Sequence, residues 1–235
     1  MGIAAGRAAK YRINRYDECA IEQALQIGES HPGTAIDVVS VGPDRAAGAV
    51  RRALGMGAHN GVHLRAQGGE QGPFAIAERI ASYARTQEYD LILCGLVSED
   101  LMQGLVGPLV AEHLSMPCAT SVVSIRGISP GSGKIVAERE MGGRLRQVLE
   151  LDMPGVLTLQ SGINEPRYPS LSNMMRAHRT ELRTVDSASL AQPEPRQSTL
   201  RLEYPEKSRA GVVLEGSTQQ KASQLLQILR QKAVI

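Results

Sequence analysis

Short apolar runs typical of strands alternate with amphipathic stretches typical of helices between residues 17 and 159. The runs are bounded by glycine or proline, and the amphipathic stretches repeat their apolar side chains at a period near 3.6. This alternation at βαβ spacing predicts an α/β fold with a parallel sheet covered by helices. We expect helices at 17–29, 44–56, 74–85 and 104–114, and strands at 35–41, 61–64, 89–95, 121–125 and 155–159.

The pattern changes after residue 133. Residues 134–140 and 144–151 read as two strands around Gly142-Gly143, which predicts an antiparallel hairpin appended to the sheet. From residue 187 the composition shifts to Ser, Gln, Pro and Leu, followed by an amphipathic helix at 217–232. We therefore expect an α/β domain at 1–186 and an extended arm with a helix at 187–235. The arm and helix either grip a partner subunit or pack back on their own domain.

The bulk composition excludes several classes of protein. Among the 235 residues the net charge is +2 and aromatic residues make up 3%, which argues against a nucleic-acid partner. No apolar run is long enough to insert into a membrane, and no signal peptide opens the sequence. Cys19, Cys94 and Cys118 are far apart, so a reducing, cytoplasmic location is expected, without disulfides. The histidines show no metal-ligand spacing, so no metal site is expected.

Ligands of open α/β sheets bind beyond the carboxyl ends of the strands. Residues 14–18, 41–43 and 95–104 are expected at that edge, and the last of these leads into a helix N-terminus suited to a phosphate. Gly95 and Gly104 would permit close backbone approach. The alternative is an ordinary strand-to-helix loop, since there is no Walker lysine and no G-x-G-x-x-G motif. Cys94 is better explained as a buried thiol than as a nucleophile.

Residues 162–177 form a distinctive run after the last predicted strand. Pro166 and Pro169 hold the backbone extended and delay a helix until after position 169. Leu171 would then be an apolar residue presented on a pre-ordered segment, which suggests a contact loop. The alternative is an ordinary connection between a strand and a helix.

Several segments together resemble one family. Residues 164–177 read N-E-P-R-Y-x-x-L-x-N-x-M-x-A, and residues 14–18 read N-R-Y-D-E. Further segments are V-G-P at 106–108, A-E-H-L at 111–114, E-R-E at 138–140 with Gly142-Gly143, and R-A-G-V-V-L-E-G at 209–216. From Asn14 to the C-terminus, the chain resembles the β subunit of electron-transfer flavoproteins.

The resemblance implies an adenine nucleotide hydrolase-like, Rossmann-like fold and a carrier subunit that is not an enzyme alone. It implies an α-subunit partner that carries the redox FAD, and AMP or a second FAD in the β chain. Electrons would pass from acyl-CoA or other flavin dehydrogenases to a quinone reductase or another acceptor. Leu171 matches the anchor of the loop that docks on dehydrogenases, and Glu140 matches an acidic residue near the α subunit. The residues expected to bind the nucleotide are Asn14, Arg15, Tyr16, Asp17, Val41, Gly95, Val97, Asp100, Gln103, Gly104 and Val106.

The chain departs from the family pattern in three places. Family members open with a hydrophobic strand, whereas residues 1–13 are rich in Ala, Gly and Arg. Either Ile3-Ala4-Ala5 is a poor substitute for that strand or the start of the chain is truncated. A missing central strand should leave unpaired ladder groups and an exposed apolar flank. The family's D-G-D-T-G-Q loop reads D-L-M-Q-G-L at 100–105, which predicts weakened nucleotide binding. Arg15 replaces a proline and would offer a phosphate a charged contact.

Two other classes share this type of fold. One is a stand-alone nucleotide-binding module like the universal stress proteins, which would homodimerise and bind ATP. The other is an adenylating enzyme. The chain lacks the glycine-rich phosphate loop of the first and the S-G-G-x-D-S loop of the second.

Overall fold

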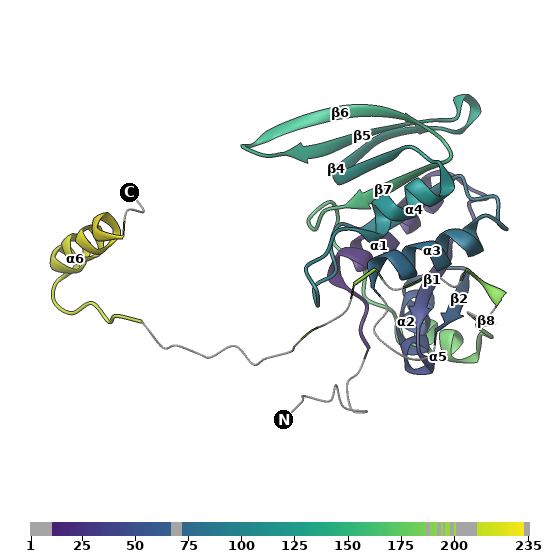
Figure 1. Cartoon of the computed structure of the whole chain (residues 1–235), viewed down its shortest axis with the longest axis horizontal. Helices are drawn as coiled ribbons and strands as arrows, with labels where there is room; N and C mark the ends of the chain where they lie inside the picture. Colours follow the sequence, from purple (N-terminus) through teal and green to yellow (C-terminus); the bar gives the residue numbers. More distant parts are fainter. Residues whose placement is uncertain are drawn as a thin grey trace. The chain divides into compact units, whose positions relative to one another are not determined.

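The computed structural model describes residues 11–66, 72–186, 189–191, 194, 196–197, 200 and 211–232. Helices and strands alternate as the sequence predicts (Figure 1). The helices are α1 (Arg15–Ser30), α2 (Ala47–Met56), α3 (Pro73–Ala84), α4 (Val106–Leu114), α5 (Leu171–Arg179) and α6 (Thr218–Gln231), with short 3-10 turns at η1 (Asp44–Ala46) and η2 (Pro130–Ser132). The strands are β1 (Asp37–Gly42), β2 (Asn60–Arg65), β3 (Leu91–Gly95), β4 (Cys118–Ser129), β5 (Lys134–Met141), β6 (Leu145–Asp152), β7 (Gly155–Leu159) and β8 (Arg183–Asp186).

The described strands form two sheets. One has the order β1-β2-β8 and is parallel throughout. The other has the order β3-β7-β4-β5-β6; β3, β7 and β4 are parallel, and β5 and β6 continue it as an antiparallel hairpin. The predicted α/β class, with a Rossmann-like parallel sheet and an appended hairpin, is therefore confirmed.

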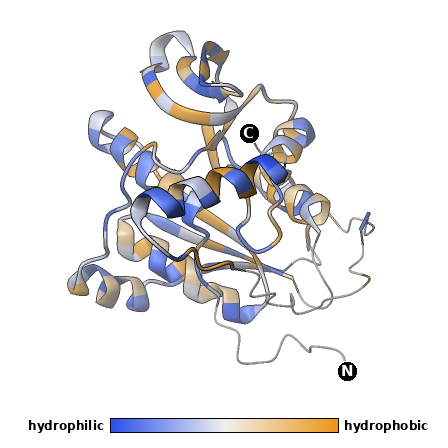
Figure 2. Cartoon of the chain, turned by 90° about the vertical axis from the view of Figure 1, so that its left-hand side faces the viewer, coloured by the Kyte–Doolittle hydropathy of each residue, from blue (hydrophilic) through white to orange (hydrophobic). Residues whose placement is uncertain are grey.

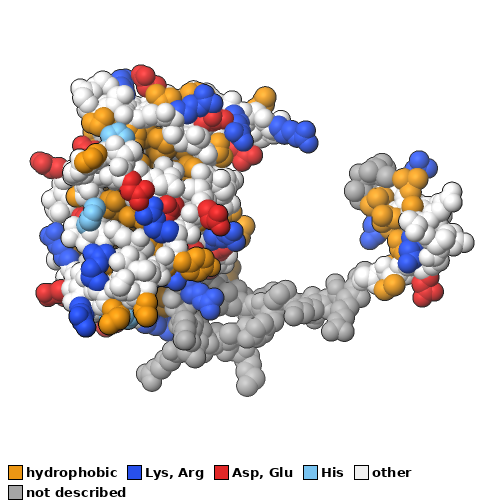
Figure 3. Space-filling view, turned by 180° about the vertical axis from the view of Figure 1, so that it is seen from behind, with side chains coloured by type: hydrophobic (Ala, Val, Ile, Leu, Met, Phe, Trp, Pro, Cys, Tyr) orange, Lys and Arg blue, Asp and Glu red, His pale blue; other side chains and the backbone are white. Residues whose placement is uncertain are grey.

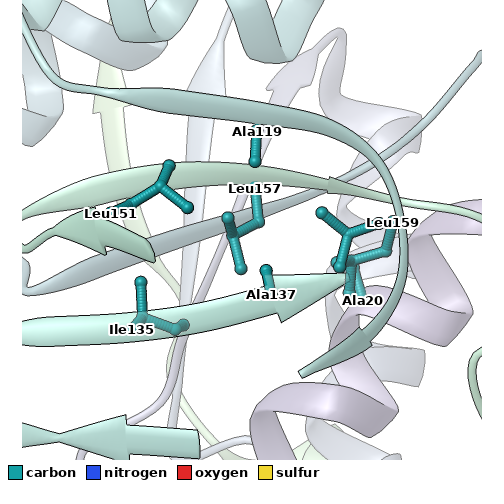
Figure 4. Close-up of a cluster of buried hydrophobic side chains, with 8 residues drawn as sticks. Ala20, Ala119, Ile135, Ala137, Leu151, Leu157 and Leu159 are labelled. Atoms are coloured by element: carbon teal, nitrogen blue, oxygen red, sulfur yellow. The ribbon is translucent and has the colours of Figure 1, made fainter. Parts of the chain in front are cut away.

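Strand β7 is the buried centre of the larger sheet. All five of its residues are buried, because strands flank it on both sides and α1 and α4 contact it. Leu157 and Leu159 pack with Ile135 and Ala137 of β5 and with Ala20 of α1 (Figure 4). The sequence signal for such a strand is a continuous apolar run, which residues 155–159 supply.

A second cluster lies under the smaller sheet. Leu25 of α1 and Leu54 of α2 pack there with Ile36 and with Ala177 of α5. In Figure 2 the helices carry both hydrophilic and hydrophobic residues, as expected for elements that bury one face. The 3.6-residue period that predicted α1 and α2 thus corresponds to their packed faces.

Strands β1 and β3 are each at the edge of a sheet. No described strand pairs with the outer edge of either one. No residue of β3 and only the last residue of β1, Gly42, is fully buried. Among the described strands these edges are unpaired and their side chains are half-buried, which is in line with the prediction that a missing central strand would leave unpaired ladder groups. The segment concerned, Ile3-Ala4-Ala5, lies outside the described residues.

Some boundaries differ from the sequence prediction. Helix α1 begins at Arg15 with Asn14 as its N-cap residue, two residues before the predicted start at residue 17. The Asp17 side chain is turned toward β3, where it accepts a hydrogen bond. Strand β8 was not predicted, because the run R-T-V-D at 183–186 has only one large apolar residue.

Residues 211–232 belong to a compact unit separate from the body of the chain, which ends at Leu200. Helix α6 starts with a capping box, in which Ser217 and Gln220 each bond the other's backbone N–H. No described residue of α6 is buried, and Leu225 and Leu226 are exposed. Most of the predicted arm from residue 187 lies outside the described residues. Within the described part of the chain, no helix has the length and apolar character of a membrane span.

The contact between α4 and β7 provides a test of the fold. A Cβ atom at Gly107 would collide with the Thr158 side chain, so Gly107→Ala should lower the free energy of unfolding by about 1–3 kcal/mol. Gly127→Ala is the matched control, because no atom lies within 4 Å of the Cβ position there. Urea denaturation of both variants measures the difference; equal stabilities would contradict the close packing.

Candidate functional site

The start of α1 is joined to the loop that follows β3. The Asn14 side chain donates to the carbonyl of Val97 at 2.8 Å and accepts from the N–H of Glu99 at 3.2 Å. The Glu99 carboxylate in turn accepts from the N–H of Arg15 at 3.0 Å. Two segments more than eighty residues apart are thereby fixed against each other at the carboxyl edge of β3.

Asp17 is the acidic centre of this region. Its carboxylate accepts from the N–H of Gly95 at 2.6 Å and from the Asn14 amide at 3.1 Å. Burial raises the pKa of Asp17 more than these hydrogen bonds lower it, and the nearby Glu99 raises it further. The carboxylate occupies the outer edge of β3, where a backbone donor would otherwise lack a partner.

Two glycines allow the backbone to approach closely here. A Cβ atom at Gly95 would come within 2.7 Å of the Tyr16 Cβ and 2.8 Å of the Asp17 nitrogen. One at Gly104 would come within 2.8 Å of the Leu96 carbonyl oxygen. The loop is closed by hydrogen bonds from Ser98 to the Gln103 carbonyl and from Met102 to the Ser98 carbonyl. Small residues at 95 and 104 are therefore steric requirements of this loop.

A cavity of about 330 Å³ opens beside these residues. Its lining includes eight of the residues predicted to bind a nucleotide, namely Asn14, Asp17, Val41, Gly95, Val97, Gln103, Gly104 and Val106. Arg15, Tyr16 and Asp100 do not line it. Asp100 is exposed and accepts from the N–H of Leu101, while Tyr16 packs against Gly95. The structure thus brings together most of the residues that the sequence predicted, in one crevice.

The crevice is suited to a ligand group that is neutral or that binds backbone N–H groups at a helix N-terminus. It is less suited to an anion that needs a salt bridge with a basic side chain. Its lining contains no lysine or arginine, so the positive potential comes from the backbone N–H groups at the N-terminus of α4, which begins at Val106. Val41 and Val106 provide apolar wall. Burial, with Asp17 nearby, raises the pKa of the Cys94 thiol to about 12, which makes it a poor nucleophile at neutral pH.

The 162–170 loop is clamped to the middle of α1. Arg167 contacts the buried carboxylate of Glu22 through Nε and Nη2, both at 2.8 Å, and through its own N–H at 3.1 Å. Its remaining nitrogen, Nη1, reaches Glu29 at 2.7 Å. Burial alone would raise the pKa of Glu22, but Arg167 holds it below its ordinary value. The Asn164 amide adds a bond to the Cys19 carbonyl at 3.0 Å.

This clamp presents an apolar tip. Tyr168 is 89% exposed and Leu171 is 79% exposed, although the backbone on either side of them is fixed. Ser170 caps α5 by accepting from the N–H of Asn173, which starts the helix immediately after Pro169. The prediction that Leu171 is held out on an ordered segment agrees with this geometry. The partners Glu22 and Glu29 were not predicted, because only the fold brings α1 beside the loop.

The hairpin contains two acidic residues with different surroundings. Glu140, the predicted contact residue, is exposed on β5. Glu138 is buried and pairs with Arg126 at 2.5 Å and with Arg146 at 3.1 Å. Glu138 therefore holds the hairpin against β4 through its ion pairs with Arg126 and Arg146, in which Glu140 takes no part.

The described surface shows no strong concentration of charge on the face drawn in Figure 3. Charged side chains of both signs are interspersed there. Across the described residues, no group of three or more His, Cys, Asp or Glu side chains has the geometry for a metal ion.

Comparison with known proteins identifies relatives over nearly the whole chain. Residues 3–190 match the family model described as the electron transfer flavoprotein domain. The electron transfer flavoprotein subunit beta of Bacillus subtilis is 35% identical over 97% of this chain and 89% of its own length. Those of Methylophilus methylotrophus and Bos taurus are 31% and 32% identical, over 94% and 88% of this chain and 86% and 81% of their own lengths.

The Arg167 clamp leads to a prediction about stability. Arg167→Met should lower the free energy of unfolding by about 2 kcal/mol at neutral pH, because Glu22 would be left buried and unpaired while the arginine itself is partly exposed. Because the fold lowers the pKa of Glu22, this stabilisation is lost as the pH falls through that lowered pKa. Urea unfolding at neutral and acid pH measures both effects. Arg139→Met, which removes a bond to Gln147, is the control; an equal loss there would contradict the assignment.

Proposed function

The chain belongs to the electron transfer flavoprotein family, and from this premise we propose that it is the β subunit of a heterodimeric electron carrier. It pairs with an α subunit that holds the redox FAD. Electrons pass through the heterodimer from acyl-CoA or other flavin dehydrogenases to a quinone reductase or another acceptor. The β chain alone catalyses no reaction. The relatives, each named as a subunit beta and covered over most of its length, support this proposal.

We propose that the crevice beside α4 holds AMP or a second FAD. The free N–H groups at Val106 and Gly107 would bind a phosphate, since a helix N-terminus favours negative charge. Val41 would contact the base or sugar from the end of β1, and Gly104 keeps the loop close enough for backbone contact. The observation that carries this assignment is the convergence of eight predicted residues on one cavity.

The affinity of this crevice is expected to be weaker than the family pattern would give. Met102, Gln103 and Leu105 stand where the family loop has a carboxylate, a hydroxyl and an amide, and the side chains of Met102 and Leu105 are exposed and apolar. Losing two or three hydrogen bonds of about 1 kcal/mol each lowers affinity roughly 30- to 150-fold. Asn14, Asp17 and Gln103 remain as polar groups at the rim.

Two surfaces are assigned to partners. Leu171, held out by the Arg167 clamp, docks on the dehydrogenase as the apolar anchor of the loop. Glu140 on the hairpin and the arm with its helix, residues 187–235, contact the α subunit. The exposed apolar side chains of Leu225 and Leu226 on α6 support the second assignment, since such a stripe is suited to burial against another chain.

Co-expression with the cognate α subunit tests the assembly and the nucleotide together. We expect a heterodimer, and acid release followed by chromatography should show one FAD per heterodimer. AMP below one equivalent would indicate the weakened crevice, and two FAD would indicate a flavin in the β chain. A chain that stays monomeric beside its cognate α subunit would overturn the proposed function.

The docking role of Leu171 predicts a kinetic effect. Leu171→Glu should raise KM for the dehydrogenase as electron donor by about tenfold or more and leave the heterodimer and its FAD content unchanged, because the side chain is exposed and outside the crevice. Leu171→Met, which keeps an apolar side chain, should retain most of the activity. Steady-state reduction of the carrier at varied dehydrogenase concentration measures this; equal KM values in all three proteins would remove Leu171 from the interface.

A further inference from the structure

Helix α5 carries Leu171 in its first turn, and it is a short helix with little of its own surface buried. It has nine residues, of which Ala177 alone is fully buried. Leu171 and Met175, which lie one turn apart, are both exposed. A helix of this length is marginal in water unless other elements hold it. The orientation of Leu171 therefore depends on the contacts that α5 makes with the rest of the domain.

Arg51 of α2 provides one of these contacts, at the C-terminal end of α5. Its Nη1 donates toward three carbonyls, those of Ala177 at 2.8 Å, His178 at 3.1 Å and Thr180 at 3.0 Å. The last carbonyls of a helix have no donor within the helix, and they form the negative end of its dipole. A guanidinium group placed there supplies both hydrogen bonds and positive charge. Arg51 therefore caps α5 from another helix.

Helices α2 and α5 also pack closely against each other. A Cβ atom at Gly55 of α2 would collide with the Met174 Sδ and would come within 3.3 Å of the Pro169 Cβ. Ala177, about one turn after Met174, belongs to the hydrophobic cluster under the smaller sheet. Helix α5 therefore lies on α2 along the face that carries Met174 and Ala177.

The two ends of α5 are held by different helices. The Arg167 clamp fixes the loop before α5 to α1, and Arg51 fixes the end of α5 to α2. Between these contacts the helix has about two and a half turns. Loss of the Arg51 contact would release the last turn, and the turns that remain would be too few for a stable helix. Leu171 would then leave its ordered position for part of the time.

We propose that Arg51 is a positioning residue for docking, which keeps α5 helical to its end and so holds Leu171 in the conformation that the dehydrogenase binds. This inference rests on the docking role of Leu171 proposed above. When Leu171 is in place in only a fraction of the carrier molecules, the apparent affinity for the dehydrogenase falls by that fraction. Electron transfer within the bound complex is unaffected, so KM changes and kcat does not.

The neighbouring residue provides a matched control. Arg52 is directed to α1, where it pairs with Glu18 at 3.1 Å. Arg51 and Arg52 are both half-buried on α2. Arg52→Met removes an ion pair of α2 and leaves the three carbonyl contacts of α5 in place. The two variants therefore separate the capping of α5 from a general loss of charge on α2.

Arg51→Met tests the proposal in the heterodimer with the α subunit. We expect KM for the dehydrogenase as electron donor to rise about three- to tenfold at an unchanged kcat. Hydrogen exchange in a fragment that covers α5 should become about tenfold faster. Arg51→Lys keeps the charge and part of the hydrogen bonding, so its KM should be intermediate. Arg52→Met should keep the KM and the α5 exchange of the unmodified protein, and the FAD content should be the same in all of these proteins.

A double-mutant cycle shows whether Arg51 acts through Leu171. If it does, adding Arg51→Met to Leu171→Glu should raise KM no further, because the docking side chain is already lost. Effects that multiply in the double variant would mean that Arg51 acts independently of Leu171, and would overturn the inference.

The remaining outcomes are distinguishable. Faster exchange in α5 with an unchanged KM would show a purely structural role, and a raised KM with unchanged exchange would show that Arg51 contacts the donor itself. Either result would overturn the positioning role. An unchanged KM in Leu171→Glu would instead refute the docking function on which the inference rests. If Arg51→Met does not fold, Arg51→Lys supplies the comparison, with an expected rise in KM of about two- to threefold.

Discussion

The hydrogen bond from the Gly95 N–H to the Asp17 carboxylate connects the first turn of α1 to the end of β3. Around it, Asn14 fixes the loop after β3, and that loop leads to the start of α4. The crevice exists because these three elements meet at one carboxyl edge. Burial of Asp17 raises the pKa of its carboxyl group, so a group that is costly to ionise lies at the centre of the site.

Helix α1 also carries the second functional region. Glu22, five residues after Asp17 and therefore on a different part of the helix, holds Arg167 and through it the loop before α5. The crevice and the exposed Leu171 are thus fixed to one rigid element. A displacement of α1 would move both at once, so we expect the two regions to respond together to changes in α1 packing.

The sequence was sufficient to predict most elements, because apolar periodicity and glycine or proline boundaries are local signals. Strand β7 and the hairpin were predicted nearly to the residue for that reason. Strand β8 was not, since its pairing with β2 and not its own composition makes it a strand. The crevice residues were named from the topology of parallel sheets and from family resemblance. Glu22 and Glu138 were missed because their partners are distant in sequence and only the fold brings them together.

The position of β7 in the larger sheet has a consequence for synthesis on the ribosome. β7 lies between β3 and β4 in space but follows both in the chain, and β8 completes the other sheet later still. Neither sheet can therefore close while the first 150 residues emerge, and β3 and β4 must remain apart until Gly155–Leu159 arrives. The nascent chain consequently exposes apolar strand edges for most of its elongation, which makes this interval the one in which a chaperone or a partner subunit would protect it most.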